Sequence, residues 1–233
     1  MRYNRERWIG LSLIICNIEN SAPISLFINF DEDILFMNIT SEEVSNIFEK
    51  LQKGDEEAFS FFYRFFINDM YAYGKSLGIE DDSVMDAIQD VFMKVFFNKP
   101  HFKSVTHFKF FLLKSLKNKL YDIFKYKSFT KTTDIQDDTF NFSIKTTVLD
   151  EIIENEDRSI VKLKVDKLLD SLSPLQKEAV YLRYIQELEY GQISELMEKN
   201  ETSIRKLVSQ AINKIRKENS TLPSIIFITL LFN

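Results

Sequence analysis

Helix-breaking residues are scarce in this chain, and their scarcity limits the folds that the chain can adopt. The 233 residues include 5 glycines and 4 prolines, so long stretches run without a residue that interrupts a helix. Leu, Ile, Phe, Lys and Glu are common in these stretches, and apolar residues recur there at helical spacing. The sequence therefore predicts an all-α protein.

The composition excludes several classes of protein. Hydrophobic residues make up 45% of the chain and charged residues 28%, which is a globular rather than a disordered composition. The glycines lack the spacing of a dinucleotide-binding or P-loop motif. The single Cys16 excludes an internal disulfide framework and a cysteine-based zinc site, and it fits a reducing compartment. We expect a cytoplasmic protein without a cofactor or a metal.

The two ends of the chain, 1–36 and 219–233, differ in composition from the part between them. In the first, arginines precede an apolar run over 8–18, which is the outline of a signal peptide. Two other interpretations are an extension translated from upstream of a start at Met37 and a segment docked on the protein. The tail 219–233 is also apolar, and it either packs on the preceding helix or contacts a partner. Both apolar runs are short for a membrane-spanning helix.

Helical periodicity divides the rest of the chain into two blocks, 37–127 and 157–218. Start and stop signals place the helices of the first block from Thr40 or Ser41, after Asp55, after Asp82, and from about Val105 to Tyr126. Those of the second block cover Ser159–Leu172, Pro174–Tyr184, Glu189–Met197 and Thr202–Lys217. Between the blocks, 128–156 loses the periodicity and is rich in Ser, Thr, Asn and Asp. We expect two helical domains joined by a flexible acidic linker.

Charge is partitioned along the chain, although the net charge is only −5. Between Lys99 and Lys127 the only acid among many lysines is Asp122, whereas the linker is mostly acidic. Residues 202–217 are basic again and contain no acid. A basic helix face is the electrostatic footprint of phosphate contact, although one such face alone can also be simply solvated. Two such faces, one in each block, favour a nucleic-acid-binding protein.

The end of the second block has the layout of a helix-turn-helix, with an ordinary helical hairpin as the alternative. The side chains expected to face inward from its two helices are Ile193, Leu196, Met197, Ile204, Leu207, Val208 and Ala211. The other face of the second helix carries hydrogen-bonding and basic side chains, at spacings that reach base edges and phosphates in a major groove. These are Thr202, Ser203, Arg205, Lys206, Ser209 and Gln210.

With these motifs in order, the sequence resembles the sigma-70 family of bacterial transcription initiation factors, specifically its short extracytoplasmic-function (ECF) group. Leu172-Ser173-Pro174-Leu175-Gln176-Lys177 and Tyr190-Gly191-Gln192-Ile193-Ser194-Glu195-Leu196 are similar to region 4 of that group. Gly54-Asp55-Glu56-Glu57-Ala58-Phe59, Asp86-Ala87-Ile88-Gln89-Asp90-Val91-Phe92-Met93-Lys94 and Phe108-Lys109-Phe110-Phe111-Leu112 are similar to its region 2. The apolar tail is similar to that of Bacteroides-like members.

The resemblance implies a role for particular residues. The residues expected to bind core RNA polymerase are Asp86, Gln89, Asp90, Phe92 and Lys94. Those expected to recognise and open the minus-10 promoter element are Phe102, Lys103, His107, Lys114, Lys117, Asn118, Asp122 and Lys125. The exposed face of the second helix of the helix-turn-helix is expected to read the minus-35 element. The resemblance also implies an anti-sigma partner, often membrane-bound, and no small-molecule substrate.

Four positions depart from the family pattern. Glu198 and Lys199 stand at the helix-turn-helix turn, where a glycine and then a hydrophobic residue are usual. Lys125 stands where arginine is common, which removes a bidentate donor. Leu207 replaces a frequent basic residue. Promoter specificity therefore does not transfer from the family to this chain.

Two other functions compete with this interpretation. Asp82, Asp86 and Asp90 recur every four residues and could ligate a hard cation, as in a metal-dependent enzyme. No histidine joins them, and no nucleophile–base pair or HExxH motif occurs in the sequence, so we expect no catalysis. The second alternative is a stand-alone helix-turn-helix regulator, in which the first block is a dimerisation module and no polymerase is needed.

Overall fold

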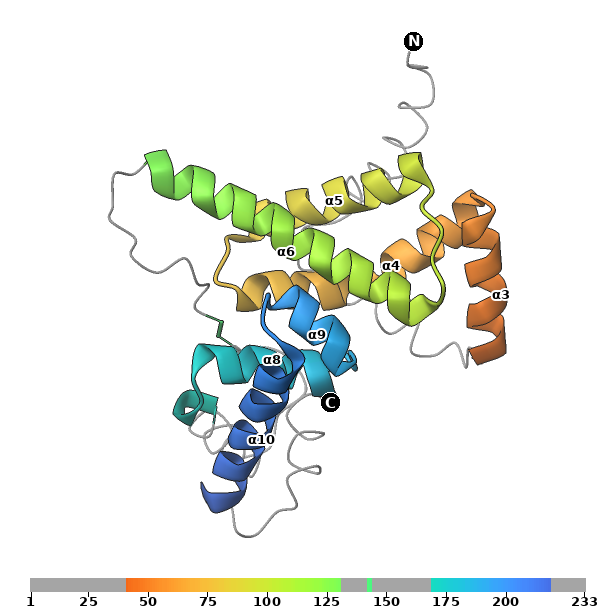
Figure 1. Cartoon of the computed structure of the whole chain (residues 1–233). Coiled ribbons are helices and arrows are strands. Elements are labelled where there is room, and N and C mark those ends of the chain that lie inside the picture. Colours follow the sequence, from red (N-terminus) through yellow and green to blue (C-terminus); the bar gives the residue numbers. More distant parts are fainter. Residues whose placement is uncertain (1–40, 131–141, 144–168, 219–233) are drawn as a thin grey trace, which may run out of the picture. The chain divides into compact units, whose positions relative to one another are not determined.

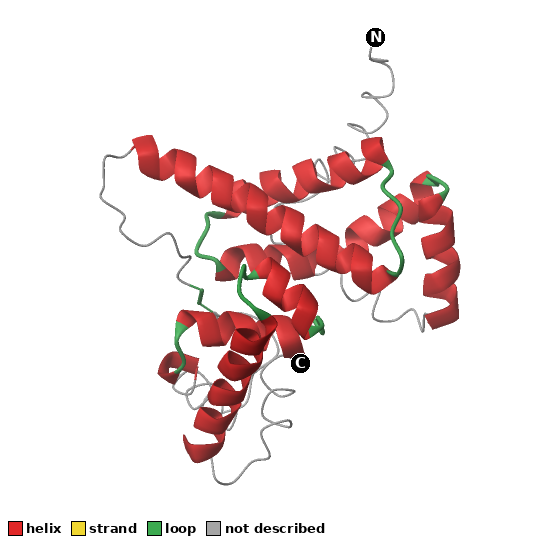
Figure 2. Ribbon diagram, viewed as in Figure 1, coloured by secondary structure: helices red, strands yellow, loops and turns green. Residues whose placement is uncertain are grey.

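The computed structural model describes residues 41–130, 142–143 and 169–218, and these residues contain helices and loops but no strand (Figures 1 and 2). The predicted all-α class is confirmed. The helices are α3 (Ser41–Gln52), α4 (Glu56–Ser76), α5 (Asp81–Asn98), α6 (Val105–Thr130), α8 (Pro174–Tyr184), α9 (Tyr190–Leu196) and α10 (Glu201–Glu218).

The chain divides into two units between Ile47 and Phe48. The described part of the first unit is the beginning of α3 alone. The second unit contains the rest of α3 and all the other helices, so both predicted blocks, except the beginning of the first, belong to one unit. The boundaries predicted for two separate domains therefore stay a prediction.

Local signals in the sequence account for where the helices begin and end. The Asp55 carboxylate accepts a hydrogen bond from the Ala58 backbone N–H at 2.8 Å and caps α4. Ser173 and Gln176 form a reciprocal capping box at the start of α8, where Pro174 occupies the first turn. Gly54 and Gly78 follow α3 and α4 with φ of +82° and +81°, a conformation that glycine adopts without steric cost.

The predicted end of the last helix of the first block differs from the structure. Helix α6 continues to Thr130, beyond the predicted end near Tyr126 and into the predicted linker, because Lys, Ser and Phe at 127–129 do not interrupt a helix. Of the predicted helix Ser159–Leu172, only its last turn is described, and Leu169–Ser171 are helical there. The N-terminal segment 1–36, most of the linker and the tail 219–233 lie outside the described residues.

The core of the first block is built from aromatic rings of α4, α5 and α6. Phe62 of α4 is fully buried and meets Phe108 of α6 edge-to-face, with ring centroids 5.8 Å apart. Phe92 of α5 meets Tyr63 of α4 at 4.8 Å in the same geometry. Such pairs add to the stabilisation from burial, because the positive edge of one ring lies against the negative face of the other. The three helices are therefore held by aromatic packing.

The second block has an aliphatic core between α8, α9 and α10. Leu182 of α8, Ile193 of α9, and Ile204 and Ala211 of α10 are fully buried. Of the residues expected to face inward, only Leu207 differs, because its side chain is half-buried and lines a groove on the surface. The helix-turn-helix packing predicted from the sequence is otherwise confirmed.

Gly74 marks a close approach between α4 and Val84 of α5, which generates the first prediction. A Cβ at this position would lie 2.6 Å from Val84 Cγ1, and Val84 is fully buried. Val84 has a single preferred rotamer and cannot swing away, so we expect Gly74→Ala to destabilise the fold by about 1–3 kcal/mol in urea unfolding. Gly191→Ala is the control, because the atom nearest to its Cβ is 3.9 Å away. Equal stability of both variants would contradict the tight contact.

Candidate nucleic-acid interface

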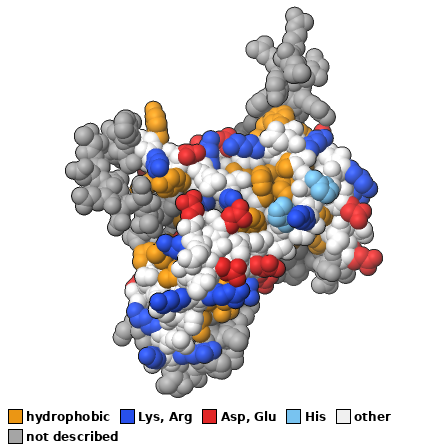
Figure 3. Space-filling view, in the orientation of Figure 1, with side chains coloured by type: hydrophobic (Ala, Val, Ile, Leu, Met, Phe, Trp, Pro, Cys, Tyr) orange, Lys and Arg blue, Asp and Glu red, His pale blue; other side chains and the backbone are white. Residues whose placement is uncertain are grey.

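Helix α10 separates a buried face from an exposed one. Ile204, Val208 and Ala211 face the core. The side chains that the sequence assigned to DNA lie on the opposite face, where Ser203 is half-buried and the others are exposed, namely Thr202, Arg205, Lys206, Ser209 and Gln210. Lysine and arginine side chains gather over the surface formed by α8 and α10 (Figure 3). The structure therefore brings the predicted minus-35 residues together on one basic face.

Asn200 caps the N-terminus of α10, a role that the sequence analysis missed. Its side-chain oxygen accepts a hydrogen bond from the Ser203 backbone N–H at 2.7 Å, which is the geometry of an N-cap. The sequence did contain the signal, because an Asn directly before the first residue of a helix is a common N-cap. The cap fixes a helix end whose positive dipole favours a phosphate.

An open groove of about 500 Å³ runs between the start of α8, the turn and α10. Polar and basic side chains line most of it, together with the two leucines Leu175 and Leu207. The polar lining residues are Glu198, Lys199, Asn200, Ser203, Lys206 and Gln210. This hollow gives the recognition face a concave border next to the helix N-terminus.

Tyr190 contacts two arginines, and the sequence analysis gave it no role. The Arg205 guanidinium lies 4.2 Å from the Tyr190 ring centroid, and the Arg183 guanidinium lies 4.9 Å from it. Arg205 Nε also donates to Glu201 Oε1 at 3.0 Å, and Arg183 Nη1 donates to the Leu188 carbonyl at 2.9 Å. Arg205 is therefore held on an aromatic platform by cation–π attraction and an ion pair.

The lysines of α6 that the sequence assigned to the minus-10 element are bound by acids of the second block. Lys117 Nζ lies 2.8 Å from Glu178 Oε1, and Lys114 pairs with Glu195. Asn118, Asp122 and Lys125 are exposed further along α6. The Lys125 Nζ lies 4.5 Å from the Tyr121 ring centroid. The predicted minus-10 residues of α6 thus form two groups: two lysines are paired with acids of the second block, and the other residues are exposed.

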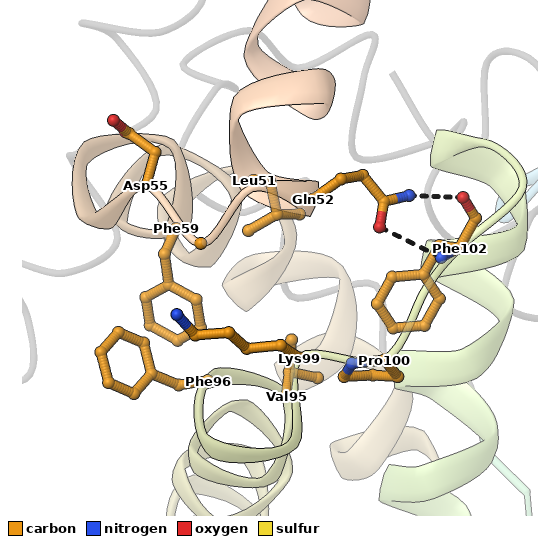
Figure 4. A pocket seen from close by; sticks show the side chains of 10 residues that line it. Leu51, Gln52, Asp55, Phe59, Val95, Phe96, Lys99, Pro100 and Phe102 are labelled. Carbon is orange, nitrogen blue, oxygen red and sulfur yellow. Dashed lines mark hydrogen bonds between the residues drawn. The ribbon is translucent and has the colours of Figure 1, made fainter.

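The loop before α6 is fixed from α3, and it does not expose Phe102. The Gln52 amide accepts a hydrogen bond from the Phe102 backbone N–H at 3.3 Å and donates to the Phe102 carbonyl (Figure 4). The Phe102 side chain is 4% exposed, and its ring centroid lies 4.6 Å from that of Phe108. Phe102 therefore supports the loop from the core in this structure, and it is not an open surface on which a base could stack.

Of the neighbouring predicted residues, Lys103 lies at the surface of this loop, and His107 is half-buried in the first turn of α6. Lys103 is exposed, and its backbone N–H donates to His107 Nδ1 at 3.4 Å. The His107 backbone N–H in turn donates to the Ser104 hydroxyl at 3.1 Å, which caps the start of α6. A cavity of about 20 Å³ behind the loop, lined in part by Phe59 and Pro100 (Figure 4), is large enough for no more than about one water molecule.

The predicted polymerase-binding residues of α5 form an exposed stripe, with one exception. Asp86, Asp90 and Lys94 are exposed at spacings of four residues, and Gln89 is half-buried beside them. Asp90 Oδ2 also lies 2.6 Å from Lys119 Nζ of α6. Phe92 is 2% exposed and packs in the aromatic core, because it lies on the opposite face of α5. Phe92 is therefore a core residue in this structure.

Two absences hold for the described residues 41–130, 142–143 and 169–218. None of the helices in these ranges is long and apolar enough to cross a membrane. In the same part of the chain, no group of three or more His, Cys, Asp and Glu residues is arranged to hold a metal ion.

The turn of the helix-turn-helix generates the second prediction. Glu198 has φ of +52°, a left-handed conformation that costs a residue with a Cβ roughly 1–2 kcal/mol. We expect Glu198→Gly to raise the free energy of unfolding by up to about 1 kcal/mol, since the greater entropy of unfolded glycine cancels part of the relief. Glu198→Ala removes the same charge and keeps the strain, so it should bring no gain. A urea titration of both variants measures the difference.

Comparison with known proteins locates one recognised region. Residues 162–215 match the family model described as "Sigma-70, region 4". No curated protein gives a significant match to the chain. Among solved structures, the chain is similar to the sigma factor RpoE of Bartonella quintana in complex with the anti-sigma factor NepR, with 21% identity, a TM-score of 0.48, and coverage of 71% of this chain and 98% of that chain. The matched residues 162–215 include α8, α9 and nearly all of α10, which carry the exposed basic face.

Proposed function

We propose that this protein is a sigma factor of the ECF group, which binds core RNA polymerase and directs it to specific promoters. The observation that carries the proposal is the match of residues 162–215 to sigma-70 region 4, over the helices that place Arg205 and Lys206 on one exposed face. The protein makes no bonds in this role, because the polymerase performs the chemistry. Membership of a Bacteroides-like subgroup is the finer part of the proposal and is supported by the composition of the tail alone.

Helix α10 reads the minus-35 element in this proposal. Its N-terminal turns enter the major groove, where Arg205 and Gln210 are suited to purine edges, and Lys206 and the capped helix end are suited to phosphates. Tyr190 acts as a positioning residue, because it holds the guanidinium that reaches the DNA. Direct contacts from only a few side chains carry the sequence information, while the phosphate contacts set the register.

In this proposal, the first block binds core RNA polymerase and the minus-10 element. The exposed stripe Asp86, Asp90 and Lys94 has the polar character of a protein-binding surface. Lysines of α6 and Lys103 of the loop are suited to the backbone of a separated strand. The partners are then core RNA polymerase, promoter DNA and an anti-sigma protein, and the location is the cytoplasm.

Run-off transcription tests the proposal. Core polymerase from the host is assayed with and without the full chain, on the DNA upstream of the gene and on a library of genomic fragments. Transcripts that depend on the protein support a sigma factor, and their start sites define the promoter motif. Tight binding to one DNA site by the protein alone, with no transcripts, would instead support a stand-alone regulator.

The polymerase-binding stripe generates the third prediction. Asp86→Ala and Gln89→Ala should each weaken binding to core polymerase by about 2–10-fold, because each removes polar contacts at the interface. Binding is measured by biolayer interferometry with immobilised core enzyme. Glu49→Ala, which removes an exposed acid from α3, is the control and should bind as the wild type does. Unchanged affinity in both α5 variants would contradict the assignment of this surface.

The aromatic platform generates the fourth prediction. Tyr190→Ala should lower holoenzyme affinity for a promoter found in the run-off assay by about 2–5-fold, the amount expected from a partly exposed cation–π contact. Tyr190→Phe keeps the ring and should retain the affinity. If Tyr190 acts through Arg205, the double variant with Arg205→Ala should be no weaker than Arg205→Ala alone. Additive losses would show that Tyr190 acts on its own.

A further inference from the structure

Two leucines interrupt the polar lining of the groove beside α10. Leu175 in the first turn of α8 and Leu207 of α10 both line this groove, and each side chain is half-buried. The other described residues of the lining are polar or charged. A leucine side chain neither donates nor accepts a hydrogen bond, so this apolar pair, Leu175 and Leu207, is matched only by a ligand group that is itself apolar.

The side chains that frame Leu207 are suited to base edges. Ser203 lies four residues before Leu207 and Gln210 three residues after it, so the three share one side of the helix, and all three line the groove. Arg205, held on the Tyr190 ring, lies roughly 200° around the helix axis from Leu207. The exposed face of α10 is therefore bordered by Arg205 on one side and by Leu207 on the other.

Packing within the second block fixes the position of the apolar pair. Ile204 and Val208 are buried on the core face of α10, so the backbone that carries Leu207 is anchored on both sides of it. Leu175 follows the capping box at the start of α8, whose two hydrogen bonds measure 3.1 and 3.3 Å. Both leucines therefore have defined positions relative to the side chains suited to bases.

One group in the major groove of DNA matches an apolar side chain. The edges of the base pairs present hydrogen-bond donors and acceptors there, together with the 5-methyl group of thymine. Removing such a methyl group from water against a leucine strengthens binding by about fourfold. A polar group at the same place, such as the amino group of cytosine, would lose its water and gain no hydrogen bond.

Charge favours DNA over an apolar partner protein as the ligand of this border. Lys199 and Lys206 line the same groove, and the end of α10 capped by Asn200 adds the positive end of a helix dipole. Glu198 is the one acid among the described residues of the lining. The border therefore has a net positive charge, which suits a polyanion that carries an apolar group on its base edges.

We propose that Leu207, supported by Leu175, receives the 5-methyl group of a thymine in the minus-35 element and makes the protein selective for a T·A pair at that position. The inference rests on the proposed function, because α10 must enter the major groove for Leu207 to meet a base. Ser203 and Gln210 form hydrogen bonds with the neighbouring base edges. Selection at this border of α10 therefore comes from shape and desolvation.

Replacement of thymine by deoxyuridine tests the inference, because it removes the 5-methyl group and keeps every hydrogen-bonding group of the base. The minus-35 element is taken from the promoters found in the run-off assay, and each of its thymines on either strand is replaced in turn. Fluorescence anisotropy measures the affinity of holoenzyme assembled with the full chain. We expect one thymine whose replacement weakens wild-type binding by about fourfold and leaves the binding of Leu207→Ala unchanged.

Three further variants separate contact with the methyl group from an effect on folding. Leu207→Met keeps an apolar side chain of similar volume and should retain the response to deoxyuridine. Ile212→Ala removes a half-buried apolar side chain of α10 that does not line the groove, and it should retain the response too. Leu175→Ala should reduce the response without abolishing it. Circular dichroism and thermal melting establish that each variant is folded.

The converse measurement moves the methyl group to cytosine. A C·G pair in place of the identified T·A pair should weaken binding of the wild-type holoenzyme. Substitution of 5-methylcytosine for that cytosine should then strengthen binding by about fourfold in the wild type and in Leu207→Met. It should bring no gain in Leu207→Ala, because the methyl group has lost its partner.

Equal responses to deoxyuridine in the wild type and in Leu207→Ala at every thymine would overturn the inference, while protein-dependent transcripts would leave the sigma role standing. Weaker polymerase binding by Leu207→Ala, with an unchanged response to deoxyuridine, would place the apolar pair against a protein and overturn it as well.

Absence of transcripts would count against the sigma role instead. The deoxyuridine series is then measured with the full chain alone, on the DNA that it selects from a random library. A response that is lost in Leu207→Ala would support the contact with thymine without the sigma role. A chain that selects no DNA, with or without polymerase, would overturn both proposals.

Discussion

The aromatic core between α4, α5 and α6 is the constraint on which the other surfaces depend. Phe62 and Phe108 fix the start of α6 against α4, and Phe102 ties the preceding loop to the same cluster. Gly74 allows the helices to approach closely enough for Val84 and Leu120 to touch the backbone. Because rigid rings allow few alternative packings, the exposed stripe of α5 and the lysines of α6 have defined positions.

In the second block, contacts within the protein fix the exposed basic face of a small helix-turn-helix. Asn200 satisfies the helix end, Glu198 makes the turn at a conformational cost, and Tyr190 restrains the Arg205 side chain. Restraining a flexible arginine in the free protein lowers the entropy that is lost when it binds. The Tyr190 ring and the Asn200 cap therefore favour selective binding through a few side chains that are already held in place.

Glu178 of α8 joins the two helical blocks through charge, because it pairs with Lys117 of α6. A buried carboxylate is tolerated because Tyr73 and Lys117 both bind it, and a buried charge that lost its partners would be costly. The same oxygen therefore stabilises the packing of the two blocks against each other.

Much of the fold and part of the site were predictable from residues near one another in the sequence. Pro174, Gly54 and Asp55 gave local boundary signals that the structure confirms, and the period of Ile204, Val208 and Ala211 predicted the buried face of α10. Phe92 and Phe102 were assigned to surfaces because a motif does not show which face of a helix or loop a ring occupies. The packing of neighbouring helices buries both.

The helical class, the helix-turn-helix and the basic face of α10 follow from the sequence, because each depends on residues within a few turns of one another. Which cations are already paired follows instead from the packing of distant helices. Glu178 is separated from Tyr73 by 105 residues and from Lys117 by 61, and no periodicity links positions so far apart. Phe142 gave no signal either, because a single aromatic residue in a polar segment acquires its role only when two distant helices enclose it.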